Sequence, residues 1–551
     1  MRGRIFIVLC LLCSVVAAQD LVYLENCETL SFDVERLPDA QILRGDVRFR
    51  HDSALMFCDS AYFYDKANSL DAFGHVRMIQ GDTLLGFADR MYYDGNSKFV
   101  RFREHVKLIH KGDELTTDSL DYNRKEELAY YLTGGTLKDS LNTLTSIWGQ
   151  YNTTTSQARF QHDVELVNPN FVLTSDTLEY NTDSKVADIV GPTKIVYDQE
   201  TTIESTEGWY NTETHLSMLL KRSVITHTDG MMMTGDTIFY DKAQGYGQVL
   251  GAMVMRDSSN MMTLTGDYGE MYEEGHRGYA TKRALMIDWS DSLNYAYMHA
   301  DTLFTEEVTT DTTFRQVRAF YGVRLYRNDV QSVCDSLVYN GHDSIITLYH
   351  EPRCWNENNQ MSADTIRIYI VNGTVDHIIG IGSALAVKRE TAEYFDQMAG
   401  KEMYCHVIDG EMRQVDVNGN AETIFYPKEE SSDSTAAPEY IGMNRTMSSY
   451  VKIFIEEQQI HHVLFTTETT GVLYPMDQIP ETEKRLSGFF WAEQERPMSP
   501  MAVLQPTRRL ERPTTAIKSA VDNVEEDEAT IERRRSRREK AKNRNVVKSE
   551  K

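Results

Sequence analysis

A seven-residue pattern returns along this chain at a nearly constant interval, and this limits the folds open to the sequence. Its clearest copies cover residues 117–123, 175–181, 235–241 and 334–340. Each copy closes on tyrosine followed by asparagine or aspartate. Between residues 64 and 241 the closing tyrosines lie 29 or 30 residues apart, at Tyr64, Tyr93, Tyr122, Tyr151, Tyr180, Tyr210 and Tyr240. A fixed period of this size predicts a stacked repeat array.

The residues within one repeat predict strands joined by turns. Leu120 and Tyr122 are two apart, so on a strand they point to one side while Asp121 points to the other. Asn123 tolerates a left-handed backbone and can bond its own chain two residues on, which favours a turn. Each repeat is therefore strand, turn, strand, turn. One repeat cannot bury its apolar face alone, whereas stacked repeats form a continuous core.

Charge and motif content exclude several functions. The 551 residues carry a formal net charge of -26, which argues against a nucleic-acid partner because phosphates attract Lys and Arg. The recurring Asp118, Asp176, Asp236 and Asp335 stand once per repeat, whereas an active site needs one special place. We therefore interpret them as structural residues at corners. The sequence shows no nucleophile elbow, zinc-protease motif or phosphate loop, so we predict neither an enzyme nor a cofactor or metal.

Four segments are predicted from composition. Residues 1–18 have basic, apolar and small-residue regions in the order of a secretory signal peptide, so we expect export. Residues 19–282 hold regular repeats, and residues 283–475 hold irregular repeats with loops. Residues 476–551 contain several prolines, then acidic and basic runs, and are predicted to be disordered.

Two further features leave alternatives open. Cys27 and Cys58 lie about one period apart, so in a stacked array they are either a disulfide or two buried thiols. Methionines crowd residues 231–271, where they either fill gaps in the core or contact irregular apolar ligands.

The repeats resemble the OstA-like family of lipopolysaccharide-transport proteins over roughly residues 25–425. The resemblance rests on the D-x-L-x-Y-[ND] units and on partner segments such as residues 43–47, 72–76 and 102–106. It implies an all-β, elongated, twisted β-jellyroll, open along one edge, of about a dozen repeats. The interior of such a jellyroll is apolar and holds acyl chains.

The resemblance also implies a function. A periplasmic protein of this kind binds lipopolysaccharide through its lipid A acyl chains and passes it toward the outer membrane. Its partners are the other transport components at both membranes, and copies associate end to end; outer-membrane association of this chain is left open. The residues expected to line the lipid groove are Val47, Phe49, Val106, Leu108, Leu120, Tyr122, Val164, Leu166, Leu178, Tyr180, Ile238 and Tyr240.

Two other functions remain open at this point. A parallel β-helix on the cell surface, either an adhesin or a polysaccharide-active enzyme, would also give a period of this size. A purely structural scaffold for an outer-membrane complex is the third reading.

Overall fold

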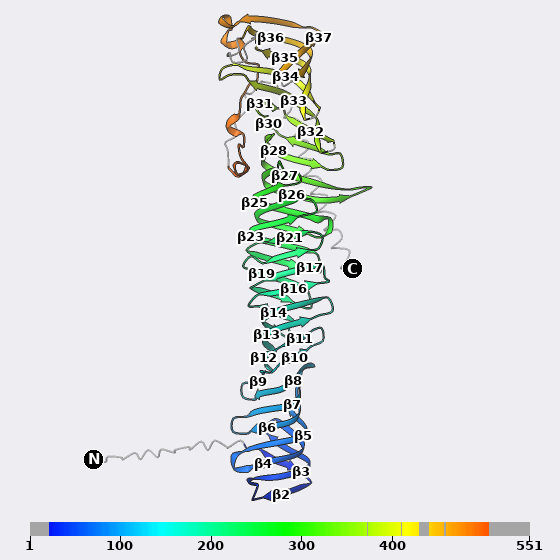
Figure 1. The fold of residues 1–551 in the computed structure, drawn as a ribbon, viewed down its shortest axis with the longest axis vertical. Helices are drawn as coiled ribbons and strands as arrows, with labels where there is room; N and C mark the ends of the chain where they lie inside the picture. Colours follow the sequence, from blue (N-terminus) through cyan, green and yellow to red (C-terminus); the bar gives the residue numbers. More distant parts are fainter. Residues whose placement is uncertain (1–20, 372, 409, 429–439, 457–458, 506–551) are drawn as a thin grey trace, which may run out of the picture. The chain divides into compact units, whose positions relative to one another are not determined.

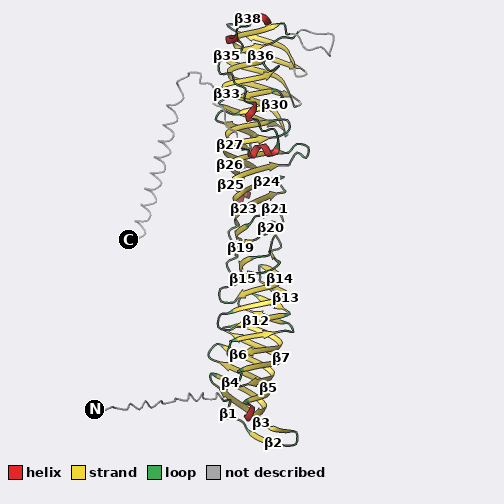
Figure 2. Cartoon of the chain, turned by 90° about the vertical axis from the view of Figure 1, so that its left-hand side faces the viewer, coloured by secondary structure: helices red, strands yellow, loops and turns green. Residues whose placement is uncertain are grey.

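The computed structural model describes residues 21–371, 373–408, 410–428, 440–456 and 459–505. The predicted signal peptide and residues 506–551 of the predicted tail lie outside the described residues. The chain divides into two compact units, unit 1 up to Ala319 and unit 2 from Phe320. Both consist of strands with a few single 3-10 turns, so the all-β prediction is confirmed (Figure 2).

Unit 1 is a series of antiparallel strands stacked as successive rungs (Figure 1). Its first thirteen strands are β1 (Tyr23–Asn26), β2 (Thr29–Asp33), β3 (Leu37–His51), β4 (Ala54–Tyr64), β5 (Ser69–Gln80), β6 (Leu84–Asp94), β7 (Phe99–His110), β8 (Asp113–Asn123), β9 (Leu128–Tyr131), β10 (Gly135–Lys138), β11 (Thr143–Ser146), β12 (Trp148–Asn152) and β13 (Gln157–Val167). Those that follow are β14 (Phe171–Asn181), β15 (Val186–Ile189), β16 (Thr193–Tyr197), β17 (Thr201–Ser205), β18 (Gly208–Asn211), β19 (Leu216–Leu220), β20 (Val224–His227), β21 (Met231–Thr234), β22 (Thr237–Asp241), β23 (Tyr246–Asp257), β24 (Met262–Tyr272), β25 (Arg277–Asp288) and β26 (Ala296–Thr309). The 3-10 turns are η1 (Asp65–Ala67) and η2 (Glu274–His276), and β27 (Thr313–Tyr326) contains the division between the units.

Unit 2 contains β28 (Gln331–Asn340), β29 (Ile345–Tyr349), β30 (Arg353–Asn356), β31 (Asn359–Ser362), β32 (Thr365–Val371), β33 (Thr374–Arg389), β34 (Phe395–Ile408), β35 (Glu411–Phe425), β36 (Gly442–Glu456), β37 (Gln459–Thr466) and β38 (Thr470–Pro475). It ends in η3 (Met476–Gln478), η4 (Glu481–Glu483), η5 (Glu493–Glu495) and η6 (Pro500–Leu504). The strand pairs of both units are antiparallel, for example β3 with β4 and β33 with β34. The alternative of a parallel β-helix is therefore wrong for the described strands.

One repeat of about 30 residues is a pair of antiparallel strands with two turns. The asparagine that closes the motif acts as predicted: Asn152 and Asn181 each accept backbone N–H bonds from the residues two and three positions on. The left-handed residue, however, is the fourth after the asparagine, such as Ser156 and Lys185, and not the asparagine itself. The side chain starts the turn, and a later residue reverses the chain.

Six long strands of unit 1 carry a bulge at their middle, namely β3, β5, β7, β13, β23 and β25. Between β3 and β4 the register passes from Arg44 opposite Ser60 to Val47 opposite Cys58, which leaves Gly45 and Asp46 as a bulge. Both bulge residues have positive φ, as do the equivalent pairs at 74–75, 104–105, 162–163, 251–252 and 282–283. Bulges sharpen the twist and bend of a strand. This row of bends is called the corner below, and the apolar core lies inside it.

The turns of unit 1 alternate between two edges. Edge A consists of turns 52–53, 81–83, 111–112, 139–142, 168–170, 198–200, 228–230 and 258–261, and edge B of turns 65–68, 95–98, 124–127, 153–156, 182–185, 212–215, 242–245 and 273–276. Backbone bonds link turns along the same edge, as from Thr153 N to the Glu127 carbonyl at 2.9 Å and from Thr228 N to the Glu200 carbonyl at 3.0 Å. Each edge is thus a continuous stack of turns.

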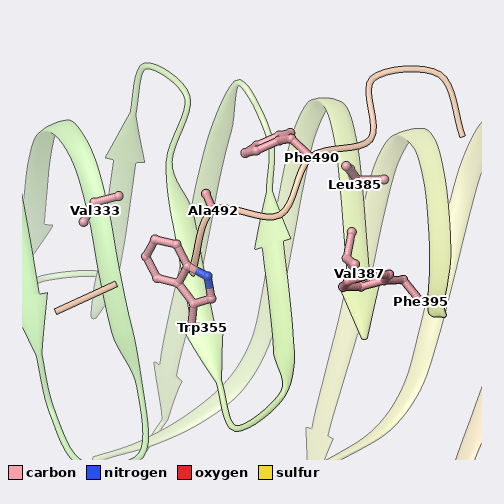
Figure 3. Close-up of a cluster of buried hydrophobic side chains, with 7 residues drawn as sticks. All are labelled: Val333, Trp355, Leu385, Val387, Phe395, Phe490 and Ala492. Carbon is pink, nitrogen blue, oxygen red and sulfur yellow. The ribbon is translucent and has the colours of Figure 1, made fainter. Parts of the chain in front are cut away.

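Residues 476–505 correct the predicted boundary of the disordered tail. These residues, called the strap below, run along unit 2, and Leu486, Phe490, Ala492 and Val503 are buried. Phe490 and Ala492 join Trp355 and Phe395 in one apolar cluster (Figure 3). The strap stays in place because its few apolar side chains enter the core of unit 2, although its composition is that of a disordered segment.

A corner glycine gives the first testable prediction. Gly251 has a φ of +76°, and a Cβ there would lie 2.5 Å from an Asp236 carboxylate oxygen. We expect Gly251→Ala to lower the free energy of local unfolding of β23 and β24 by about 1–2 kcal/mol, because a Cβ is strained in this conformation. Hydrogen exchange of these strands measures it. Gly191→Ala is the control, since Gly191 has open space around it; equal effects would contradict the corner assignment.

Candidate functional site

All twelve residues predicted to line a groove point to the inside of unit 1. Their exposed fractions run from 0% to 2%, so all twelve side chains are buried. They come from β3, β7, β8, β13, β14 and β22. Inner residues from both halves of each bent strand meet in this interior, which is continuous with methionines, phenylalanines and alanines of neighbouring rungs. The arrangement offers an apolar environment.

The interior is closed by side chains where edges A and B approach each other. These contacts are called the seam. At the first rungs His51 Nδ1 lies 2.5 Å from the Tyr93 hydroxyl, and Arg124 Nε donates to Gln80 at 2.9 Å. Further along, His110 Nδ1 lies 2.8 Å from the Tyr151 hydroxyl. Tyr93 and Tyr151 thus bury their rings in the core and direct their hydroxyls to the seam, whereas Tyr64 is half-buried and donates to Asp71 at 3.3 Å.

Ion pairs continue the seam. Lys98 on edge B donates to Asp52 on edge A at 2.6 Å, and Lys111 on edge A donates to Asp183 on edge B at 3.0 Å. Both pairs are partly exposed, so each contributes at most about 1 kcal/mol. Asp257 and Arg315 form a more buried pair at 2.9 Å. These pairs could not be predicted from local sequence patterns, because their partners lie 46 to 72 residues apart.

Asp139 is the most enclosed charged group of the seam, with a side chain only 1% exposed. Its carboxylate accepts from the Tyr180 hydroxyl at 2.6 Å, from Lys185 Nζ at 2.9 Å and from the backbone N–H groups of Leu141 and Asn142. Burial by itself would raise the pKa of Asp139, but these donors hold the pKa below its usual value. Burial raises the pKa of Tyr180, which remains a neutral donor.

The seam should loosen in acid. Burial, as the largest cause, lowers the pKa of His110 from 6.5, and the pKa of Asp139 lies below 3.8. The unfolded chain therefore binds protons that the folded seam does not. The stabilisation by these two groups is fully present above their pKa values in the unfolded chain, and it is lost as the pH falls through their pKa values in the folded chain. We expect hydrogen exchange at turns 111–112 and 139–142, corrected for intrinsic rates, to rise first below about pH 6.5 and again below about pH 4. His110→Gln should remove the first step; a single step common to both turns would contradict the assignment.

The corner carries the recurring acidic residues. Asp118, Asp176 and Asp236 lie there exposed, and Asp335 is half-buried. On neighbouring rungs His75 bonds Asp59 and His105 bonds Asp89, each at 2.7 Å, and these carboxylates raise the pKa of both histidines. The carboxylates cap a bend in the strand next to them, as expected for structural residues. Among the described residues, no group of three or more His, Cys, Asp or Glu side chains could hold a metal ion.

Cys27 and Cys58 are free in the structure. Residues one period apart are separated by two strand spacings, about 9.5 Å, because each repeat contains two strands. The segment around Cys27 pairs with one side of β3, and Cys58 pairs with the other side. A disulfide needs Cα atoms within about 7 Å. Of the two alternatives, free thiols agree with the structure, in which Cys58 is buried and Cys27 is half-buried.

Methionines fill the interior near β21 to β24. Met233, Met253 and Met271 are buried there, and the other walls carry glycines. A Cβ on Gly247 would lie 2.6 Å from Met233 Cε, and one on Gly269 would lie 2.1 Å from Met253 Sδ. Flexible thioether side chains therefore occupy space that the glycines leave free, so this is the most adaptable part of the interior.

A hollow of about 820 Å³ lies on the outer surface beside the corner, over β13, β14, β16 and β17. Its walls mix Glu165, Lys194 and Glu204 with hydroxyl side chains such as Ser205 and Ser223. Val164, one of the twelve inner residues, also lines this hollow.

Comparison with known proteins agrees with the repeats. Residues 19–176 match the family model described as OstA-like protein, which covers β1 to β13 and the first half of β14. The resemblance found in the sequence is thus confirmed over these residues. The chain has no match among curated proteins. In the described part of the chain, no helix has the length and apolarity to cross a membrane.

Proposed function

Because residues 19–176 belong to the OstA-like family, a lipopolysaccharide-transport type of family rather than an enzyme family, we propose that this chain binds lipopolysaccharide by its lipid A acyl chains. The chain then carries it through the periplasm toward the outer membrane. The interior of unit 1 receives the acyl chains, and the sugar headgroup stays in water outside the seam. The twelve inner residues are the contact surface.

One observation carries this proposal: side chains, and not strand pairing, close the interior. Edges A and B meet through the seam, so the interior can open without loss of a β-ladder. Burial of a hydrocarbon chain contributes about 0.8 kcal/mol per methylene, or about 8 kcal/mol for ten. That exceeds the cost of parting the exposed pairs Lys98–Asp52 and Lys111–Asp183, at about 1 kcal/mol each. Side chains fill the interior when no ligand is bound. An entering acyl chain would therefore displace the methionines near β21 to β24 first.

The partners follow from the same reading. Other lipopolysaccharide-transport components would deliver the cargo at the inner membrane and receive it at the outer membrane. End-to-end self-association is part of the proposal, because the first rung exposes Phe32 and Val34, at 66% and 75%, beside an unpaired strand edge.

Two measurements test the proposal. Solvent extraction of the purified full chain followed by mass spectrometry should release lipid A; bound oligosaccharide alone would favour the surface-protein alternative.

A second test closes the seam with a short bis-maleimide between Asp52→Cys and Lys98→Cys, in a Cys27→Ser background. We expect lipid A loading to fall at least tenfold with reagent and to be unchanged without it. Normal loading through a locked seam would contradict opening at these rungs.

A further inference from the structure

A second apolar space lies in unit 2, apart from the seam of unit 1. A cavity of about 200 Å³ opens between β34, β35, β36 and β37, and its apolar walls are Met398, Ile424, Phe425, Ile453, Ile460, Val463 and Phe465. Asp396, Gln397, Thr423 and Asn444 form its polar side. Apolar cavities of about 150 Å³ stay dry and bind small hydrocarbons. The size and lining therefore suit a segment of an alkyl chain.

The strap lies against the wall of this cavity. Gln397, which lines the cavity, donates from its side-chain amide to the Lys484 carbonyl at 2.9 Å and accepts from Leu486 N at 2.8 Å. Leu486 is buried against Ile424, Tyr426 and Met443, and Ile424 is itself a wall residue. The strap therefore contacts the cavity wall through two residues, the polar Gln397 and the apolar Ile424.

The two halves of the strap are held with different strength. Residues 489–505, the anchor, place Phe490 and Ala492 in the apolar cluster of Figure 3, and Gln360 brackets them by accepting from Ala492 N and donating to the Phe490 carbonyl. Glu495 pairs with Arg353, and both side chains are at most 2% exposed. Residues 476–487, the lid, have Leu486 as their one buried apolar residue, with Met476 and Ile479 partly buried against the same cluster. Glu483 pairs with Arg445 across a partly exposed contact, and Arg485 lies over the Phe395 ring.

Gly488 joins the lid to the anchor. Its φ is +80°, and a Cβ there would meet no heavy atom within 4 Å. A glycine with free space and a left-handed backbone is suited to absorb a change in direction. The other end of the lid follows β38, which pairs with β36. The lid is thus a segment with fewer fully buried side chains than the anchor, and it lies between two fixed points.

We propose that the unit 2 cavity is a binding site for a single alkyl chain and that residues 476–487 are its lid, which lifts about Gly488. The inference rests on the proposed lipid-carrying function and adds a second, gated site to it. An alkyl chain enters as Leu486 leaves Ile424 and as the Gln397 amide exchanges its two backbone bonds for water. The anchor stays in place, so the strap remains attached to unit 2 throughout.

Binding of a dansyl-labelled undecanoic acid to the full chain tests the site. We expect Val463→Trp, which fills the cavity from its wall, to weaken the binding at least tenfold. The matched control is Leu464→Trp on the next residue, which is 47% exposed and faces away; its affinity should stay within twofold. Equal affinity in both variants would place the ligand elsewhere and overturn the site.

Hydrogen exchange tests the lid in the unsubstituted chain. The fatty acid should speed exchange in the lid around Leu486 at least tenfold and leave the anchor around Ala492 unchanged. Leu486→Ala should raise the affinity severalfold, whereas Met498→Ala, an exposed change in the anchor, should not. Unchanged lid exchange at saturating ligand overturns the gating.

The two proposals fail separately. A chain that carries lipid A but shows no Val463-dependent binding contradicts only the unit 2 site. A chain that fills the unit 2 cavity but never carries lipid A contradicts only the proposed function.

Discussion

Replacement of Asp139 by alanine is expected to lower the local stability of unit 1 by about 3–5 kcal/mol, because it leaves a buried charge without its partner. Lys185 is 13% exposed and donates to Asp139 at 2.9 Å. The Tyr180 hydroxyl and two backbone N–H groups lose the same acceptor. Each buried donor left without a partner adds about 1–3 kcal/mol when water cannot replace the carboxylate. Hydrogen exchange of β9 to β15 measures the effect.

Two variants separate the cause from a general loss of charge. Asp183→Ala removes an acidic residue of the same seam, but its pair with Lys111 is 54% and 42% exposed, so we expect less than about 1 kcal/mol. Lys185→Met in the Asp139→Ala background should recover much of the loss, since it removes the unpaired ammonium. Equal effects of Asp139→Ala and Asp183→Ala would show that burial does not set the strength of the seam.

The core of unit 1 could be predicted because apolar and polar residues alternate within each repeat. Leu178 and Tyr180 flank Glu179, and this alternation fixes which side chains enter the interior. The turn chemistry was readable from the asparagine after the tyrosine, since its side-chain bonds reach only two or three residues along the chain. Short-range patterns of this kind can be recognised in the sequence without knowledge of the fold.

The seam could not be predicted, because its contacts depend on the bend at the corner. Asp139 and Lys185 lie 46 residues apart in turns that look like ordinary polar loops. They meet because two halves of bent strands bring edge A to edge B. The pairing of Cys27 and Cys58 was left open for a related reason: the period was known, but the number of strands in one period decides how far apart the two residues lie.

The strap escaped prediction because its apolar residues follow no period. Leu486, Phe490 and Ala492 lie among prolines and charged residues, which is the composition of a disordered segment. Their acceptors and donors, Gln360 and Gln397, are single polar residues at the starts of strands. An extended segment that docks by backbone bonds to glutamine side chains leaves almost no pattern in the sequence.

Replacement of Trp355 by alanine should have the largest effect in unit 2. Trp355 is fully buried in the cluster with Phe490 and Ala492, and large-to-small changes at such sites cost about 3–5 kcal/mol. Its indole N–H also donates to Gln360 Oε1 at 3.1 Å, the same oxygen that accepts from Ala492 N at 2.8 Å. We therefore expect loss of protection both in β30 and β31 and in the strap anchor.

Trp355→Phe distinguishes the two contributions. Phenylalanine keeps most of the apolar volume but lacks the indole donor, so the stability of β30 and β31 should fall by only about 1 kcal/mol. The Gln360 amide then loses one of the bonds that orient it toward the strap, so exchange of the anchor should rise more than exchange of the strands. Met498→Ala, exposed on the same strap, should change neither. Equal changes in strands and anchor for Trp355→Phe would mean that packing alone, without the Gln360 bracket, holds the strap to unit 2.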